Sequence, residues 1–264
     1  MNSPKEIANN YVPIGAAKTK IPSIKLFCLA VMAGIFVAIA GAAATTAAVS
    51  VPYASVGKLI GACIFPAGLA MVILAGSELF TGNCLIIISV LEKKATIMGM
   101  LKNLVIVYIG NFAGSILLSA MLAYSHVFSL FSEGLAQSCV STAVGKVTLS
   151  FSDAFLKGIL CNIFVCLAVW MAFAAKTAAG KIAALFYPIL VFVLCGFEHC
   201  VANMCYIPSG LFAKSIYGID APALTWKAFA VNNLIPVTLG NIVGGVFIGA
   251  MYWFIYLHGE KKNQ

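Results

Sequence analysis

The sequence contains no arginine and few charged residues of any kind. Charged residues make up 9% of the 264 residues, whereas a soluble globular domain carries about 25%. All sixteen basic residues are lysines, against eight acidic residues, which gives a formal net charge of +8. Arginine supplies the planar fork that reads phosphates and bases, so its absence argues against a nucleic-acid partner. The composition excludes a water-soluble enzyme and favours a chain that lies against anionic lipid or handles small anions.

The sequence also lacks the motifs of common cofactor and metal sites. It has no phosphate-binding loop of the Walker type, no HExxH motif and no CxxC pair. The nine cysteines are odd in number and lie almost all within apolar runs, which is typical of small buried hydrophobic residues and not of disulfides or zinc ligands. No cofactor or metal is expected.

Long apolar runs are abundant instead. The hydrophobic fraction is 62%, and about 20 apolar residues are needed to cross a hydrocarbon core of about 30 Å. Six regions qualify. Four are continuous, at 26–50, 104–124, 154–175 and 234–257, and two, at 59–91 and 182–213, are interrupted by polar tracts at 76–83 and 196–203. The sequence predicts an all-α integral membrane protein of six transmembrane helices, with the second and fifth helices broken.

The flanking segments predict the domain organisation and the topology. Residues 1–25 are expected to form a cytoplasmic interfacial helix that opens on the capping-box pair Ser3 and Glu6 and ends near Pro13 or Gly15. Residues 26–257 form the pore domain and 258–264 a cytoplasmic tail. With the amino terminus inside, eleven lysines fall on the inner side and five on the outer side. This bias predicts a multi-pass protein of the cytoplasmic (inner) membrane with both termini in the cytoplasm.

The two polar interruptions belong to an internal repeat. At an offset of 120 residues, Gly76, Glu78 and Asn83 align with Gly196, Glu198 and Asn203. Downstream, GNFAG at 110–114 aligns with GNIVG at 240–244 at an offset of 130. Two halves of three spans each, at about 26–124 and 154–257, run in opposite directions through a bilayer. Paired breaks in inverted halves indicate the substrate path of a transporter or channel, the alternative being two glycine-kinked structural helices.

Three titratable residues lie inside the interruptions, where charge is costly and usually functional. The repeat symmetry of Glu78 and Glu198 suggests a structural role, with each carboxylate accepting hydrogen bonds from backbone N–H groups freed by the break; proton transfer is the alternative. His199 breaks the symmetry, because Leu79 takes its place in the first half. We interpret His199 as the selective or proton-handling group, the alternative being a satisfied core histidine. A metal site built on Glu198, His199 and nearby cysteines, and with it a membrane-embedded metal enzyme, is the alternative from another class.

Four segments resemble the signature stretches of the formate/nitrite transporter family. They are AGSELFTGN at 75–83, KGILCNIFVCLAVWMAF at 157–173, GFEHCVANM at 196–204 and NNLIPVTLGNIVGG at 232–245. The resemblance extends over nearly the whole chain. It implies an aquaporin-like six-helix protomer with its own pore, assembled as a homopentamer.

The same resemblance implies roles for individual residues. It places Leu79, Phe80 and Thr81 on the first loop, with His199 facing the pore opposite Thr81. The implied apolar constrictions are Phe65, Leu69, Val165 and Phe192, the implied polar pore residues are Asn162 and Asn203, and the implied vestibule lysine is Lys146. The alternative for Lys146 is an ordinary solvated lysine at a helix entrance.

Elementary energetics favours a neutral cargo. Moving a carboxylate from water into a medium of dielectric about 4 costs on the order of 20 kcal/mol, whereas protonating it at pH 7 costs about 5 kcal/mol for a pKa near 3.5. We therefore expect a non-enzymatic pore for small monovalent weak-acid anions that pass as the neutral acid, the proton coming from His199 or from water. Formate is the first choice because the motif at 232–245 most resembles the formate branch, and nitrite and hydrosulfide are the alternatives.

Overall fold

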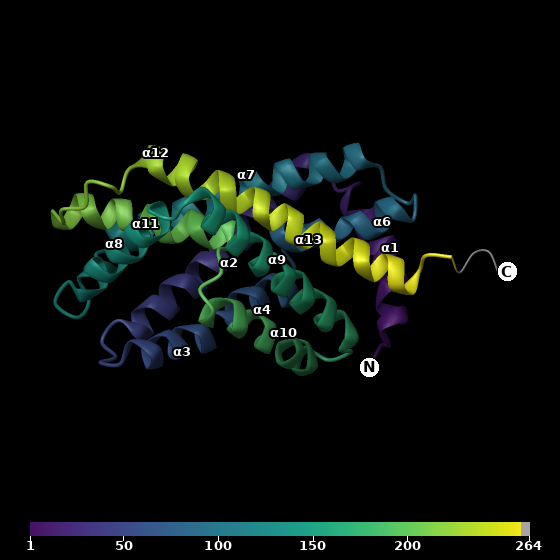
Figure 1. The fold of residues 1–264 in the computed structure, drawn as a ribbon, viewed down its shortest axis with the longest axis horizontal. Helices are drawn as coiled ribbons and strands as arrows, with labels where there is room; N and C mark the ends of the chain where they lie inside the picture. Colours follow the sequence, from purple (N-terminus) through teal and green to yellow (C-terminus); the bar gives the residue numbers. More distant parts are fainter. Residues whose placement is uncertain (260–264) are drawn as a thin grey trace.

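The computed structural model describes residues 1–259, and within that range the chain is all-helical (Figure 1). Residues 260–264, most of the expected tail, lie outside the described residues. The elements of the first half are α1 (Pro4–Lys18), α2 (Ser23–Ala48), α3 (Ala54–Ile64), α4 (Pro66–Leu74), α5 (Phe80–Asn83), η1 (Cys84–Ile86), α6 (Ile87–Leu91) and α7 (Ile97–Tyr124). Those of the second half are η2 (Val127–Ser129), α8 (Gly134–Val147), α9 (Phe151–Ala174), α10 (Ala178–Leu194), α11 (Cys200–Tyr217), α12 (Trp226–Ala228), the π-helical η3 (Phe229–Leu234) and α13 (Ile235–Tyr256).

The described residues contain five helices long and apolar enough to cross a membrane. They run over 23–48, 54–74, 97–124, 151–174 and 226–256. The second span stops at Leu74 and continues through α5, η1 and α6, and the fifth runs as α10 and then, after a break at 195–199, as α11. The expectation of an all-α membrane protein whose second and fifth spans are broken is confirmed.

Glycines at the two breaks explain why the helices stop there. Gly76 and Gly196 have positive φ angles of 78° and 70°, a conformation that costs glycine nothing and other residues a steric penalty. The residue after each glycine turns its N–H back to the helix: Ser77 N donates to Val72 O and Phe197 N to Phe192 O. This is the Schellman pattern that ends a helix.

Glycines also set the pairing of the long helices, with α2 against α7 and α9 against α13 (Figure 1). A Cβ added at Gly114 would collide with the backbone of Val31 on α2, and one at Gly244 with the backbone of Ile159 on α9. The aligned motifs at 110–114 and 240–244 are therefore the contact surfaces of equivalent helix pairs.

The amino-terminal helix is longer than expected. Its capping box is present: Glu6 N donates to Ser3 Oγ, and Ser3 N to Glu6 Oε2. The expectation that Pro13 or Gly15 ends the helix is wrong, because α1 continues to Lys18. Tyr11 is 1% exposed and α1 packs on α6, α9 and α13, so tertiary contacts outweigh the hydrogen bond that a proline cannot donate.

The segment 125–153 contains an unexpected helix, α8. It packs on α11, as α1 packs on α6 in the first half. The first half is therefore α1 followed by three spans and the second half α8 followed by three spans, so each repeat extends further towards its amino-terminal end than the sequence alone indicated.

Candidate functional site

Two cavities lie on either side of the broken helices. The first cavity, of about 390 Å³, is lined by residues that include Tyr11, Lys18, Leu69, Glu78, Leu79, Asn83 and Lys181. The second cavity, of about 400 Å³, is lined by residues that include Lys58, Phe65, Lys146, Phe192, Glu198, His199 and Asn203. The two cavities share no lining residue.

A pair of asparagines binds the backbone groups that the helix breaks set free. Phe80 N donates to Asn111 Oδ1 at 2.9 Å, and Asn111 Nδ2 donates to Glu78 O at 2.9 Å. In the second half, Cys200 N donates to Asn241 Oδ1 at 2.9 Å, and Asn241 Nδ2 donates to Glu198 O at 2.9 Å. Both asparagines are fully buried. Because unpaired backbone groups at this depth are costly, these two side chains make the breaks tolerable.

The Glu78 carboxylate lies in a cluster of side-chain donors. Lys18 Nζ is 2.6 Å from Oε1, and Asn83 Nδ2 donates to Oε2 at 2.7 Å. Asn83 Nδ2 also donates to Asn103 Oδ1 at 2.8 Å, and Asn103 Nδ2 donates to Lys18 O at 3.0 Å. We call Lys18, Glu78, Asn83 and Asn103 the first charge cluster.

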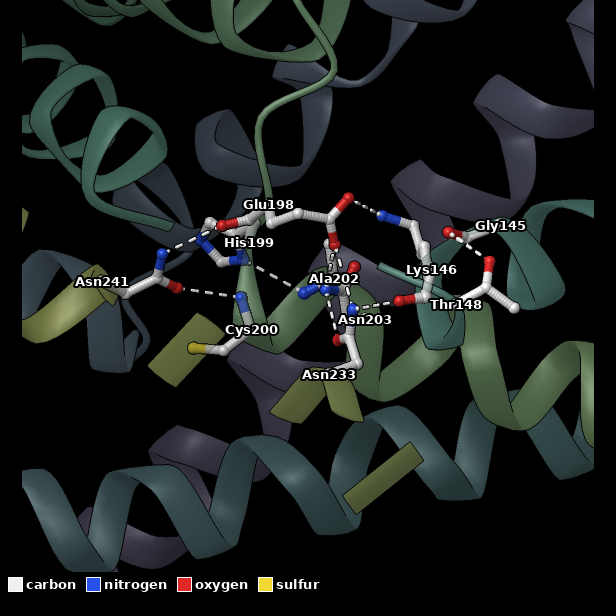
Figure 2. Close-up of polar contacts among 10 residues, drawn as sticks. All are labelled: Gly145, Lys146, Thr148, Glu198, His199, Cys200, Ala202, Asn203, Asn233 and Asn241. Atoms are coloured by element: carbon white, nitrogen blue, oxygen red, sulfur yellow. Dashed lines mark hydrogen bonds and ion pairs between the residues drawn. The ribbon is translucent and has the colours of Figure 1, made fainter. Parts of the chain in front are cut away.

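The second half repeats this arrangement (Figure 2). Lys146 Nζ is 2.9 Å from Glu198 Oε1, and Asn203 Nδ2 donates to Glu198 Oε2 at 2.6 Å. Asn203 Nδ2 also donates to Asn233 Oδ1 at 2.7 Å, and Asn233 Nδ2 donates to Lys146 O at 3.0 Å. We call Lys146, Glu198, Asn203 and Asn233 the second charge cluster.

The clusters correct one part of the sequence interpretation. The glutamates accept hydrogen bonds from lysine and asparagine side chains, and the freed backbone N–H groups of Phe80 and Cys200 go to the asparagine pair instead. The expected backbone donors are therefore wrong. Each carboxylate instead has a lysine ammonium as a donor, and this charge-assisted hydrogen bond is stronger than one from a neutral backbone N–H.

The two clusters differ in how the amide oxygen of the central asparagine is paired. Asn83 Oδ1 accepts from Lys18 Nζ at 3.1 Å, whereas the buried Asn203 Oδ1 has no hydrogen-bond partner in the described part of the chain. The Lys146 ammonium lies instead 5.4 Å from the centroid of the Tyr206 ring. The second charge cluster thus contains a buried acceptor without a partner, whereas the equivalent acceptor of the first cluster is paired.

His199 joins the two halves at the centre. Its Nδ1 accepts from Ala202 N at 3.1 Å, which caps α11, and its Nε2 lies 3.0 Å from Thr81 Oγ1. Since Nδ1 is an acceptor, the neutral ring carries its proton on Nε2 and donates it to the threonine hydroxyl. His199 is 4% exposed and Thr81 fully buried. The histidine is hydrogen-bonded at both nitrogens, as a satisfied core histidine would be, and it also lines the second cavity.

Apolar side chains surround this contact. The rings of Phe65 and Phe192 meet edge to face with centroids 5.7 Å apart, and Phe192 also stacks on the imidazole at 6.0 Å. Leu69 and Leu79 line the first cavity. Val165 is buried and lines neither cavity.

Two residues expected in the pore line neither of the two cavities. The Phe80 ring packs against Tyr108 with centroids 4.9 Å apart and lines neither cavity. Asn162 Nδ2 donates to Thr81 O at 3.2 Å and to Asn241 O at 2.6 Å. It therefore supports the short helix α5, in which Phe80 and Thr81 lie, whereas the sequence resemblance placed both on a loop.

Sequence reasoning missed Lys18, Asn103 and Asn233 as members of the clusters. Asn103 and Asn233 are separated by 130 residues, the offset of the downstream motif, so the repeat contained the signal for them. Lys18 lies outside the repeat boundaries drawn from the sequence. As for the alternative of a metal site, no group of three or more histidine, cysteine or acidic side chains within residues 1–259 is placed to hold a metal ion.

Comparison with known proteins decides the family. A family profile described as formate/nitrite transporter matches residues 5–254. The chain belongs to the formate/nitrite transporter family. The resemblance found in the sequence is thereby confirmed, and the chain is a membrane transport protein and not an enzyme.

Individual members of the formate/nitrite transporter family agree over most of their length. A probable formate transporter of Methanothermobacter thermautotrophicus is 38% identical, with 97% of each chain covered. The formate channel FocA of Escherichia coli (strain K12) is 35% identical, with 93% of this chain and 90% of the relative covered. Among solved structures, a pentameric formate channel with formate bound superimposes with a TM-score of 0.79 at 37% identity, covering 89% of this chain and 98% of that one.

Proposed function

We propose that the chain assembles as a homopentamer in which each protomer conducts a small monovalent weak-acid anion, with formate the first candidate and nitrite and hydrosulfide the alternatives. The proposal is supported by the similarity to a pentameric formate channel and by the buried hydrogen bond between Thr81 and His199, of which His199 lines the second cavity. That hydrogen bond carries the mechanism.

Passage through the centre requires the permeant to replace this hydrogen bond. His199 Nε2–H is left without an acceptor and Thr81 Oγ1 without a donor when the two separate. A neutral carboxylic acid satisfies both groups, because its carbonyl accepts from Nε2–H and its O–H donates to the threonine oxygen. Chloride can only accept, so it leaves the threonine lone pairs unpaired among apolar rings, at a cost of about 1–3 kcal/mol.

The proton that neutralises the anion comes from water in this proposal. The anion takes H⁺ in the cavity that it enters, crosses as the acid and releases H⁺ in the opposite cavity, so charge and atoms balance. His199 keeps its Nε2 proton throughout and acts as a donor. An imidazolium would need a proton on Nδ1, where Ala202 N–H already donates at 3.1 Å.

The path then follows the apolar constrictions. It passes Leu69 and Leu79 on one side and Phe65 and Phe192 on the other. Val165 and helix α5, which Asn162 supports, lie between them. Asn203 and Lys146 line the second cavity. The family resemblance implies that Lys146 draws in the anion, but its charge is largely offset by Glu198, 2.9 Å away.

The experiment is flux into proteoliposomes of formate, nitrite, hydrosulfide and chloride in parallel. We expect the three weak-acid anions to pass and chloride to be excluded. Thr81→Val keeps the side-chain shape and removes the hydroxyl, so it should reduce the ratio of formate flux to chloride flux while the protein still assembles. Chloride flux equal to formate flux in the wild type would contradict the proposal.

For location, we propose the cytoplasmic (inner) membrane with both termini in the cytoplasm, the helix α1 near the inner surface and the pore body over 26–257. An epitope attached to the carboxyl terminus should react with antibody only after the cells are permeabilised. Reaction in intact cells would overturn this topology.

A further inference from the structure

Each cavity contains two lysines, one contributed by each half of the chain. In the first cavity these are Lys18 from α1 and Lys181 from α10. In the second cavity they are Lys146 from α8 and Lys58 from α3. The lysine from the same half as the cavity's glutamate is paired with that glutamate, at 2.6 Å for Lys18 and 2.9 Å for Lys146.

The lysines from the opposite halves have no such partner. Glu78 is the acidic residue that lines the first cavity and Glu198 the one that lines the second. Neither Lys58 nor Lys181 makes an ion pair or a side-chain hydrogen bond within residues 1–259. One negative and two positive charges therefore line each cavity, and the uncompensated positive charge belongs to Lys181 in the first and Lys58 in the second.

Lys58 also lies close to the break in the fifth span. Its Nζ lies 3.1 Å from where a Cβ on Gly196 would stand. Gly196 is the positive-φ residue at the break of the fifth span, two residues before Glu198 and three before His199. The free ammonium thus lies next to the bend that leads to His199.

We propose that Lys58 and Lys181 are the anion-capturing residues of the two cavities, and that Lys146 and Lys18 are positioning residues that hold the glutamates and the broken helices. The inference rests on the proposed function as an anion pore and assigns its entry sites. A bare ammonium attracts an anion at long range, whereas the field of a lysine and a glutamate in contact falls off much faster because their charges nearly cancel.

Screening from one face of the membrane at a time tests this assignment. Right-side-out and inside-out vesicles expose opposite mouths, and the external ionic strength is raised with an impermeant salt at constant osmolarity. The Debye length falls from about 30 Å at 0.01 M to about 8 Å at 0.15 M, so we expect wild-type formate flux at low substrate to fall about threefold in both vesicle types.

The variants separate the four lysines. Lys58→Gln should lose the salt response in one vesicle type and Lys181→Gln in the other, each with flux at low salt reduced about threefold. The double variant Lys146→Met with Glu198→Gln keeps the net charge of the second cavity and should keep the salt response. Lys94→Gln and Lys227→Gln, on exposed lysines outside both cavities, should behave as the wild type.

The outcomes distinguish this inference from the proposed function. Absence of anion flux in the wild type would refute the proposed function itself. Wild-type flux together with an undiminished salt response in Lys58→Gln and Lys181→Gln would overturn the assignment. Loss of the response in the charge-neutral double variant would return anion capture to Lys146.

Discussion

The ion pair between Lys146 and Glu198 gives the sharpest prediction of stability. The two side chains are 16% and 7% exposed, with Nζ and Oε1 2.9 Å apart. At an effective dielectric of about 20, two unit charges at this distance attract by about 6 kcal/mol. Replacing Lys146 by methionine keeps the apolar stem, removes the ammonium and leaves the carboxylate with only its amide donors, Asn203 and Asn233.

We expect Lys146→Met to lower the free energy of unfolding by about 3–5 kcal/mol, the usual cost of breaking a buried pair by removing one partner. In a Glu198→Gln background the same substitution should cost less than about 1 kcal/mol, because no carboxylate is left uncompensated. The measurement is denaturant titration of the purified assembly in detergent, at fixed protein concentration, for the four members of the double-mutant cycle.

The first half supplies a matched control. Lys18→Met, with and without Glu78→Gln, removes the equivalent pair at 2.6 Å together with the hydrogen bond from Lys18 Nζ to Asn83 Oδ1. The loss there should equal or exceed the loss in the second half. An equal cost of Lys146→Met with and without the Glu198 carboxylate would refute the reasoning, since the lysine would then contribute through packing alone.

Three further predictions follow from the site and from the amino-terminal helix. His199→Asn should keep the cap on Ala202 N–H and the assembly, because asparagine is a good N-cap, and it should lower the ratio of formate flux to chloride flux. His199→Phe cannot cap the helix and should also destabilise the protein. A flux ratio unchanged at every pH would leave His199 a purely structural cap. Asn241→Leu removes the hydrogen-bond partner of Cys200 N, Gly158 O and Glu198 O and should lower the free energy of unfolding by at least about 3 kcal/mol. Asn111→Leu should have the same effect in the first half. Wild-type stability in either variant would contradict the proposal that these asparagines stabilise the helix breaks. At the start of α1, hydrogen bonds from Ser3, its backbone N–H first, lower the pKa of the Glu6 carboxyl from its usual 4.5, so the capping box is complete above pH 4.5 and is lost as pH falls through the lower folded value. The protection factors of the first-turn amides, corrected for the intrinsic pH dependence of exchange, should therefore fall only below pH 4.5, and a loss of protection at about pH 6 would be evidence against it.

Sequence patterns located the breaks because their causes are local. A glycine that must take a positive φ, and a glutamate where apolar residues are expected, both stand out within a single window at 76–83 and again at 196–203. The offset-130 motif was recognised as a repeat, but its physical role was not: Gly114 and Gly244 admit a neighbouring backbone, and Asn111 and Asn241 reach groups on other helices.

What the sequence could not supply was contact between segments. Lys18 meets Glu78 across 60 residues and Lys146 meets Glu198 across 52, and no periodicity encodes such distances. The continuation of α1 through Pro13 has the same origin, since Ser89 Oγ donates to Val12 O at 2.8 Å and Tyr11 is buried. The orientation of Phe80, whose ring faces Tyr108 and not a cavity, likewise depends on packing that only the folded chain defines.

The opposed halves of the chain shape the energy profile along the path. On the proposed path, a permeating molecule meets similar features from either mouth: a free ammonium, a paired carboxylate, an apolar narrowing and then the central hydrogen bond. Such an energy profile is nearly symmetric about its centre. The pore therefore has no preferred direction of its own, and the concentration and proton gradients alone set the direction of net flow. The mirror symmetry fails where His199 takes the repeat position of Leu79, and again where Asn203 Oδ1 lacks the lysine donor that Asn83 Oδ1 has. Any rectification at saturating substrate should trace to these two differences.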